Sequence, residues 1–556
     1  MQIPVSQILV RFLENLGVQC IFGIPGSHIL PVYDGLYDSP IRSILVKHEQ
    51  AAAFMAGGHA RITGGVGACI TTAGPGATNL VTGIASAYTD NLPVIAITGE
   101  APTHIFGKGA LQESSGESGS VDQVVLFSGI TRYHKLIERT DYLASVLNQA
   151  ARHLLAEAPG PVVLSIPFNV QKELVDESVL EQVVFTRSGS ASELPAHYID
   201  QSLALIRTAR RPLIIAGYGC IRAGAQQPLG NISQRLHIPV TSSLKAKGAI
   251  DERSALSLGS LGVTSSGYAL RYLEQQADLV LILGAGFNER TSYVWDQNLL
   301  AGKKIIQVDN NAQQLQKVFR ADLAVQADLG VYLRALDAAI QQQDLAARAP
   351  VDVGAFIKTA QQDIDHAGER IFNQQFDHVN AFYRWLEQQF PEGLVMFDDN
   401  IVFAQNFYRV SRSDRFYPNT GISSLGHSIP SAIGAACATN KPLFAMIGDG
   451  GFHMGGMELM TAVNYRIPLN VVLFNNNTMG LIRKNQQQHY NERFIDCDFT
   501  NPDYEKFAQS FGIHHARIES EQDLAGLAEK LDFLHDINLI EIMIDQDAYP
   551  NYSSRR

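Results

Sequence analysis

Two polar side chains with the chemistry of metal ligands follow two apolar runs in the last third of the chain. Asp449 lies between glycines in GDGG (residues 448–451), directly after the run Leu443–Ile447. Asn476 is the middle residue of an NNN triplet that follows the run Leu469–Phe474. One carboxylate, one amide oxygen and a backbone carbonyl would form an all-oxygen set. Such a set suits Mg²⁺ when phosphate and water supply the remaining ligands.

The glycines around the carboxylate point to a phosphate group. Gly448, Gly450 and Gly451 let the backbone come close to a phosphate, and the helix expected after them offers free N–H groups. If the two strands are neighbours in a parallel sheet, both side chains enter one crevice at the carboxyl ends of the strands. Either half alone is as consistent with an ordinary Gly-rich or Asn-rich turn. The pair at this spacing predicts a diphosphate held through a divalent metal.

Short apolar runs alternate with helical patterns through most of the 556 residues. Runs such as GACITTAGPG, LPVIAITGE, ADLVLILGAG and LNVVLFNNN are typical of strands buried on both faces of a parallel sheet. The alternation breaks in a Ser-rich linker at 185–198 and in an Ala/Gln/Asp-rich segment, a helix and a linker, at 337–362. We therefore predict an α/β protein with three doubly wound parallel-sheet domains, at 1–185, 190–340 and 363–556.

Composition and charge exclude several classes of protein. The formal net charge is −12 and there is no Lys/Arg run, which argues against a nucleic-acid or anionic-membrane partner. No stretch approaches the roughly 18 apolar residues of a membrane span, and the start, MQIPVSQILVRFLENLGV, is expected to form an amphipathic helix rather than a leader. Five scattered cysteines without a CxxC favour a reducing compartment, so we expect a cytoplasmic protein.

The GDG–NN block resembles the thiamine diphosphate signature, and further motifs agree with it in order along nearly the whole chain. FGIPGSHILPVYDGL, VKHEQAAAFMAGGHAR, TTAGPGATNLVTGIASAYTDNLPVIAITGE and SSLGHSIPSAIGAA are similar to segments of acetohydroxyacid (acetolactate) synthase large subunits and their relatives. The resemblance implies a first domain that binds the aminopyrimidine, a central domain, and a third domain that binds diphosphate and Mg²⁺. It also implies a homodimer or homotetramer with active sites at the subunit interface.

The resemblance assigns cofactor contacts to particular residues. Glu49 matches the catalytic glutamate that hydrogen-bonds the pyrimidine N1′, although a first-turn carboxylate also suits a helix dipole. Leu425 matches the bulky residue that holds the cofactor rings in a bent arrangement. Ser423 matches the carbonyl that accepts a hydrogen bond from the 4′-amino group. Both of these contacts are expected at the third domain.

The implied metal ligands come from the GDG–NN block. Asp449 and Asn476 match ligands that bind through their side chains. Thr478 matches the position that supplies a backbone carbonyl. Asn475 and Asn477 are the alternatives if the register shifts by one residue.

Other residues are expected to face the substrate. Gln112 matches a glutamine near the reacting centre, and Arg290 matches an arginine that receives the carboxylate of the second 2-oxo acid, unless it is a surface arginine. Ser27 and His28 stand where the synthases usually carry Gly and Ala. This stretch also resembles benzoylformate decarboxylase and benzaldehyde lyase, in which polar residues here face the substrate. His28 could therefore transfer protons, or only cap a helix.

The sequence departs from the synthases around the expected substrate site. ALQE is followed by a longer Gly/Ser-rich stretch, SSGESGSVDQVVLF, which we expect to form a loop beside the active site. The glycine patterns AGYGCIRAG and LGAGFNER lack a convincing ribose-binding acid about 20 residues on. FAD is therefore left open, because the synthases hold FAD in the central domain and decarboxylase relatives often lack it. An NAD-dependent oxidoreductase would need these loops to bind a dinucleotide.

We predict a decarboxylating carboligase that depends on thiamine diphosphate and Mg²⁺, acts on 2-oxo acids and joins an activated aldehyde to a second carbonyl compound. Arg290 and the longer loop favour a carboxylated acceptor. Ser27 and His28 keep two alternatives open, a non-ligating 2-oxo acid decarboxylase and an aldehyde lyase or ligase. A catalytically silent homologue is a remote alternative, against which the presence of Glu49 and Asp449 argues.

Overall fold

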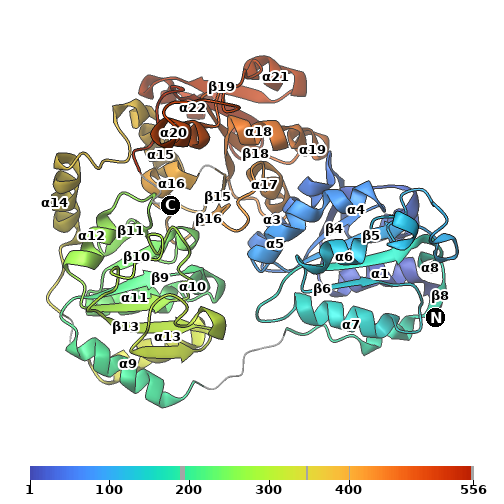
Figure 1. Ribbon diagram of the computed structural model, residues 1–556, viewed down its shortest axis with the longest axis horizontal. Helices are drawn as coiled ribbons and strands as arrows, with labels where there is room; N and C mark the ends of the chain where they lie inside the picture. Colours follow the sequence, from blue (N-terminus) through green and yellow to red (C-terminus); the bar gives the residue numbers. More distant parts are fainter. Residues whose placement is uncertain (188–193, 346–347, 400, 553–556) are drawn as a thin grey trace.

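Three parallel sheets organise the chain into three lobes (Figure 1). The computed structural model describes residues 1–187, 194–345, 348–399 and 401–552. Residues 188–193 of the predicted Ser-rich linker, 346–347 of the second predicted break and the last four residues lie outside the described part. Each sheet has six strands, all parallel, with helices on both faces. The predicted fold class of three doubly wound α/β domains is confirmed.

The first domain has the strand order β3-β2-β4-β5-β7-β6. Its strands are β2 (Cys20–Ile24), β3 (Arg42–Leu45), β4 (Gly67–Thr71), β5 (Val94–Glu100), β6 (Tyr133–Leu136) and β7 (Val162–Pro167). One face packs on α1 (Val5–Asn15), α2 (Leu30–Tyr37) and α7 (Leu143–Leu154), the other on α3 (Glu49–Thr63) and α5 (Val81–Thr89). Strands β4, β5 and β7 are buried along their whole length, because helices cover both faces. The short strands β1 (Gln2–Pro4) and β8 (Leu174–Asp176) pair antiparallel.

The central domain has the strand order β11-β10-β9-β12-β13-β14. Its strands are β9 (Pro212–Ala216), β10 (Val240–Ser243), β11 (Ser257–Leu261), β12 (Leu279–Leu283), β13 (Lys304–Asp309) and β14 (Leu323–Gln326). Helices α9 (Ala196–Thr208), α11 (Gln226–Leu236) and α13 (Leu329–Gln342) cover one face, and α12 (Tyr268–Gln275) covers the other. A further helix, α14 (Val353–His366), lies in the second predicted break and packs on α12 and β11. The helical layer of this domain therefore extends past residue 340.

The third domain has the strand order β16-β15-β17-β18-β20-β19. Its strands are β15 (Val395–Asp398), β16 (Arg415–Pro418), β17 (Leu443–Gly448), β18 (Leu469–Asn475), β19 (His514–Ile518) and β20 (Ile537–Met543). Its helices include α15 (Asp377–Gln389), α16 (Ile401–Phe407), α17 (Ser428–Ala436), α18 (Asp449–Gly455), α19 (Leu459–Tyr465), α20 (Gly480–His489) and α21 (Tyr504–Phe511). Strands β17 and β18 are neighbours, with Gly448 opposite Phe474. Asp449 and Asn476 therefore leave the sheet at the same edge.

The first and third domains share a hydrophobic core, in which α3 packs directly against α17 (Figure 1). The two backbones touch at glycines. A Cβ atom at Gly58 would lie 1.9 Å from the carbonyl oxygen of Ser431, and one at Gly434 would lie 2.0 Å from that of Met55. Both glycines are thus required by the closeness of the two helices, and this contact fixes one domain against the other.

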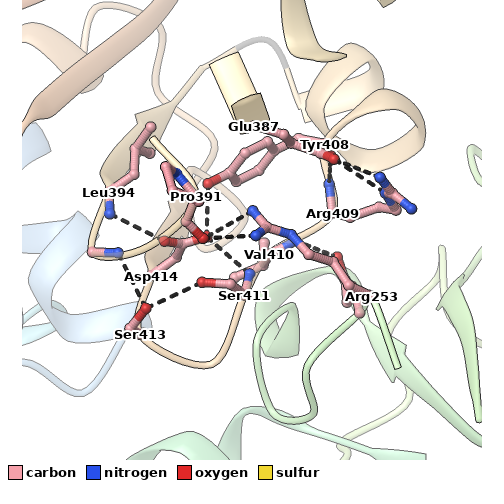
Figure 2. Close-up of polar contacts among 12 residues, drawn as sticks. Arg253, Glu387, Pro391, Leu394, Tyr408, Arg409, Val410, Ser411, Ser413 and Asp414 are labelled. Atoms are coloured by element: carbon pink, nitrogen blue, oxygen red, sulfur yellow. Dashed lines mark hydrogen bonds and ion pairs between the residues drawn. The ribbon is translucent and has the colours of Figure 1, made fainter. Parts of the chain in front are cut away.

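A polar junction joins the central and third domains (Figure 2). The buried carboxylate of Asp414 accepts hydrogen bonds from the Tyr408 hydroxyl and from the backbone N–H groups of Leu394 and Ser411. Arg253 of the central domain lies 4.0 Å from this carboxylate and donates to the carbonyl of Pro391 at 2.6 Å. The loop before β16 is therefore held from both sides.

Within the described ranges, no helix is long and apolar enough to cross a membrane. All five cysteines are free thiols, and four of them are buried.

Candidate active site

Three oxygen atoms converge at the carboxyl ends of β17 and β18. The amide oxygen of Asn476 lies 3.3 Å from Oδ1 of Asp449 and 2.9 Å from the backbone oxygen of Thr478. Exchanging the side-chain O and N atoms of Asn476 would remove this contact between oxygens. A cation between the three oxygens explains the same arrangement without that exchange, because hard divalent cations bind carboxylate, amide and carbonyl oxygens. These residues therefore fit a Mg²⁺ ion.

The carboxylate of Asp449 is held rigidly by its second oxygen. Oδ2 accepts the backbone N–H groups of Asn476 and Asn477 at 3.0 and 2.7 Å, and the side chain of Asn501 at 2.8 Å. Oδ1 accepts the N–H of Gly450 and points toward the oxygen cluster. Burial raises the pKa of Asp449, and these donors oppose the rise. A divalent cation beside it would favour the ionised form.

Asn501 is a residue that sequence reasoning missed. Its amide nitrogen lies within hydrogen-bond distance of Asp449, of Asn475 and of Asn477. It follows Asp449 by 52 positions in a segment without a regular pattern, so no sequence signal pointed to it. It ties the two strand ends together.

The register of the asparagine triplet is set by where each side chain points. Asn475 donates to Glu541 at 2.6 Å, inside the sheet. Asn477 has a positive φ of 55° and binds Asp449 through its backbone N–H. Of the three, Asn476 faces the oxygen cluster.

A cavity of about 310 Å³ opens beside these oxygens, large enough for a small ligand. Seven residues of the predicted cofactor site line it, namely Leu425, Gly448, Asp449, Gly450, Gly451, Asn476 and Thr478. A Cβ atom at Gly450 would lie 2.4 Å from the sulfur of Met479, so a side chain at this position would require Met479 to move. Ser423, two residues before Leu425, is exposed and has a positive φ of 56°.

Asp399 also lines the cavity and was not predicted. It follows β15, next to the N-terminus of α17, and its side chain is 1% exposed. Burial raises its pKa to about 7, against the opposing hydrogen bonds from the Ser428 N–H and the Asn419 side chain. His427, 3.8 Å away, has its pKa lowered to about 3 by burial. The two groups therefore do not form a charged pair near neutral pH.

Glu49 lies at the first position of α3, as the sequence suggested, and it is buried. Its Oε2 accepts a hydrogen bond of 2.9 Å from Asn79, a residue that was not singled out. Glu49 does not line the cavity that Asp449 faces. Within the described part of one chain, Glu49 therefore lies outside the cavity that the predicted metal ligands line.

Three residues predicted to face the substrate lie together in the first domain, namely Ser27, His28 and Gln112. The Ser27 hydroxyl is 3.3 Å from Nδ1 of His28, and Gln112 contacts the same imidazole. Thr72 lies 3.5 Å from the amide oxygen of Gln112. Burial lowers the pKa of His28, which favours the neutral ring, a form that can accept a proton at one nitrogen and donate from the other. Gln112 has a positive φ of 57°, so the backbone is bent sharply at this point.

The Gly/Ser-rich part of the stretch after Gln112 forms a loop, whereas its last residues, 123–127, which we expected to continue that loop, belong to helix α6 (Gln123–Ser128). Ser115 and Asp122 form an isolated antiparallel bridge. The Glu113 carboxylate accepts the N–H groups of Gly107 and Ala110, and these contacts close the segment on itself. Leu111, which precedes Gln112, is 73% exposed, so an apolar side chain faces solvent beside this loop.

Arg290 stands apart from both groups. It lies in the central domain, half-buried, and its charge opposes the pKa rise that burial causes in Tyr552 of the C-terminal segment. It does not line the cavity around Asp449.

Comparison with known proteins decides the family. Three family models match the chain, each described as a thiamine pyrophosphate enzyme domain: the N-terminal TPP binding domain at residues 3–120, the central domain at 199–336 and the C-terminal TPP binding domain at 399–535. The chain belongs to the thiamine pyrophosphate enzyme family. The cofactor of this family, thiamine diphosphate, is the one that the resemblance of the GDG–NN block implied.

Within the thiamine pyrophosphate enzymes, the chain is similar to acetolactate synthases. It is 32% identical to the probable acetolactate synthase large subunit of Methanocaldococcus jannaschii, over 97% of this chain and 92% of the relative. It is 30% identical to the acetolactate synthase isozyme 2 large subunit of Escherichia coli K12, over 97% of this chain and 95% of the relative. The predicted resemblance is confirmed over nearly the full length.

Proposed function

We propose that this protein is a decarboxylating carboligase of the acetolactate synthase type, dependent on thiamine diphosphate and Mg²⁺. It would act on 2-oxo acids and join the activated aldehyde to a second carbonyl compound. The observation that carries this proposal is the oxygen cluster of Asp449, Asn476 and Thr478 at the edge of a cavity lined by the GDGG backbone. A similar chain, from Methanocaldococcus jannaschii, carries the name probable acetolactate synthase large subunit.

Each part of the cofactor has residues suited to hold it. Asp449, Asn476 and Thr478 would bind Mg²⁺, and the glycine backbone would face the diphosphate. Leu425 would support the bound rings from the cavity wall. When bound, thiamine diphosphate would supply a nucleophilic carbon for addition to a carbonyl and a thiazolium ring that serves as the sink for the electron pair freed by loss of CO₂. Glu49 would hold a proton at N1′ of the aminopyrimidine.

The active site is proposed to form between two copies of the chain. Glu49 lies outside the cavity that contains Asp449, although the cofactor must contact both. A homodimer in which Glu49 of one subunit faces Asp449 of its partner satisfies this requirement, and two such dimers would form a tetramer. Each active site would then be assembled from the first domain of one chain and the third domain of the other.

The residues expected to face the substrate distinguish two candidate activities. A carboxylated acceptor would need a cation, and Arg290 is the predicted one. The neutral His28 beside Gln112 favours instead proton transfer to a carbonyl or alkoxide, as in a 2-oxo acid decarboxylase or an aldehyde lyase. This is the second candidate function.

We do not assign FAD to the central domain. The two glycine loops named in the sequence pack against each other, since a Cβ atom at Gly217 would lie 1.9 Å from the carbonyl oxygen of Gly284. If the central domain holds no FAD, the purified protein should lack yellow colour and flavin absorbance.

The first test measures cofactor binding through stability. Thiamine diphosphate with Mg²⁺ at 100 times its Kd should raise the free energy of unfolding by about 2.7 kcal/mol. Asp449→Asn should abolish this gain, because it removes the charge from the metal site. Asp337→Asn is a matched control, a buried carboxylate in the central domain bonded to Asn231 and Gln341, and it should keep the gain. Thermal scans of all three proteins with and without cofactor decide the matter.

The second test separates binding from chemistry. Glu49→Gln should lose turnover by about 10²-fold or more while keeping the stabilisation by cofactor, because the amide cannot hold the proton that the reaction needs. The enzyme would be incubated with a panel of 2-oxo acids, and CO₂ and products followed by mass spectrometry. Acetohydroxy acids indicate ligation, whereas free aldehydes indicate the second candidate. Near-normal turnover of Glu49→Gln would refute the role given to this residue.

A further inference from the structure

Glu458 is a buried carboxylate that no part of the proposed chemistry uses. It ends a short 3-10 helix, Gly456–Glu458, that follows α18, and it is 3% exposed. Its Oε1 accepts hydrogen bonds from the backbone N–H groups of Lys47 and His48, each at 2.9 Å. Its Oε2 accepts the hydroxyl of Thr461 at 2.7 Å. One side chain of the third domain thus holds two consecutive peptide groups of the first domain.

Those two peptide groups directly precede Glu49. They lie between β3 and α3, where N–H groups of a helix start have no partner within the helix. The side chain of His48 caps Gln50 at 3.2 Å in the usual manner, and Glu458 supplies the acceptor for the residues before it. The backbone is therefore fixed immediately before Glu49, while Asn79 fixes its carboxylate.

Keeping a carboxylate at this depth is costly. Burial raises the pKa of Glu458, and its three donors act in the opposite direction. An apolar side chain would avoid the cost of desolvation but would leave two backbone N–H groups without a partner. Hydrogen bonds from N–H groups to a carboxylate are shorter and stronger than those to neutral acceptors, so they hold the backbone more tightly.

We propose that Glu458 is a positioning residue for Glu49, which fixes the start of α3 so that the Glu49 carboxylate stays where the aminopyrimidine would meet it. Glu458 lies nine positions after Asp449, at the end of the same helical segment. The ten residues from Asp449 to Glu458 therefore contain both a proposed metal ligand and the residue that places the proposed proton-transfer group. This inference rests on the proposed role of Glu49.

The same interface contains a contact that serves as a control. The Leu45 N–H donates to the Tyr465 hydroxyl at 2.7 Å, and Arg42 donates to the Tyr465 carbonyl at 3.2 Å. Tyr465→Phe removes one hydrogen bond between the same two domains but leaves the contacts of Lys47 and His48 intact. Glu458→Gln keeps an oxygen that can accept both N–H groups.

Amide hydrogen exchange of the protein without cofactor tests the structural step. In Glu458→Ala the amides of Lys47 and His48 should exchange about tenfold faster, since each loses its acceptor. Glu458→Gln should exchange these two amides at rates closer to the wild type than to Glu458→Ala, since it keeps a weaker, neutral acceptor. Tyr465→Phe should change only the region of Leu45. Unchanged exchange in Glu458→Ala would overturn the proposal.

The functional step is read from the bound cofactor and from turnover. Glu458→Ala should slow both deuterium exchange at C2 of bound thiamine diphosphate and kcat by about 10²-fold, because small misplacements of a reacting group cost this much. KM and the stabilisation by cofactor should stay near wild type, and Glu458→Gln should restore kcat to within a few-fold. If Glu458→Ala does not fold, Glu458→Asp withdraws the carboxylate by one methylene and should show the same loss of kcat.

Three results would separate the possible failures. Normal kcat and normal C2 exchange in Glu458→Ala, with Glu49→Gln inactive, would refute the positioning role alone. Normal C2 exchange in Glu49→Gln would instead refute the proposed function on which the inference rests. A loss of stability equal to that of Tyr465→Phe, with no effect on kcat, would reduce Glu458 to a contact between domains.

Discussion

Two buried carboxylates, Asp399 and Asp449, line the same cavity, yet their surroundings differ. Asp449 belongs to the oxygen cluster and would meet a cation. Asp399 faces the N-terminus of α17 and neutral partners, and burial raises its pKa to about 7. At the residue scale, the cavity therefore combines one carboxylate suited to a metal with one that binds a proton near neutral pH.

Asp399 makes stability depend on pH. Its folded-state pKa of about 7 lies above its usual value of 3.8, so the folded protein keeps this proton where the unfolded chain loses it. Stability should therefore fall as pH rises from about 4 to 7, by at most about 1.4 kcal/mol per pH unit. Asp399→Asn should remove this slope and be more stable than wild type at pH 8. Urea unfolding without cofactor from pH 4.5 to 8.5 measures it, and parallel curves for the two proteins would contradict it.

Single residues could be predicted from the sequence where they belong to a motif with a characteristic spacing. Asp449 and Asn476 follow apolar runs, so their convergence could be read from strand ends. Asn501 and Glu458 could not, because each reaches its partner from a different segment and only the folded chain brings them together. Asp399 was not predicted, because its raised pKa comes from its burial and not from its residue type.

At the scale of elements, the contact between α3 and α17 sets the relation of the first domain to the third. Helices packed so closely exclude side chains from the point of contact. The predicted strands were the ones with continuous apolar runs, such as β5 and β18. The edge strand β19 was not predicted, because it is partly exposed and carries two histidines and an arginine. Most of helix α14 was predicted to belong to the segment between the second and third domains, because its sequence is rich in Ala, Gln and Asp.

Adding one methyl group at the helix contact should separate the two domains. Gly58→Ala should lower the free energy of unfolding by about 1–3 kcal/mol, since the new Cβ would meet the Ser431 carbonyl. Gly57→Ala on the same helix is the control. Its Cβ would meet only Leu92 at 3.4 Å, so its stability should stay within about 1 kcal/mol of wild type. Denaturant unfolding compares the two, and equal effects would show that the contact is looser than the glycines indicate.

At the scale of the molecule, the central question is whether active sites are shared between chains. Glu49→Gln and Asp449→Asn subunits should each be inactive. Mixing them through unfolding and refolding should restore about a quarter of wild-type activity, because half of a random dimer population is mixed and each mixed dimer has one intact site. Sedimentation should show a dimer or tetramer. No recovery in a mixture that has demonstrably exchanged subunits would place each site within one chain. The predicted compartment stays a prediction.

The shared core of the first and third domains has a consequence for synthesis. Helix α3 ends at Thr63 and its packing partner α17 starts at Ser428, so roughly 365 residues separate them. At about 5–20 residues per second, a ribosome needs roughly 20–75 s to bridge that interval. During that time the alanine- and glycine-rich surface of α3 has no α17 to pack against, because α17 has not yet been synthesised. The nascent N-terminal part therefore stays only partly consolidated until more than three quarters of the chain has been made.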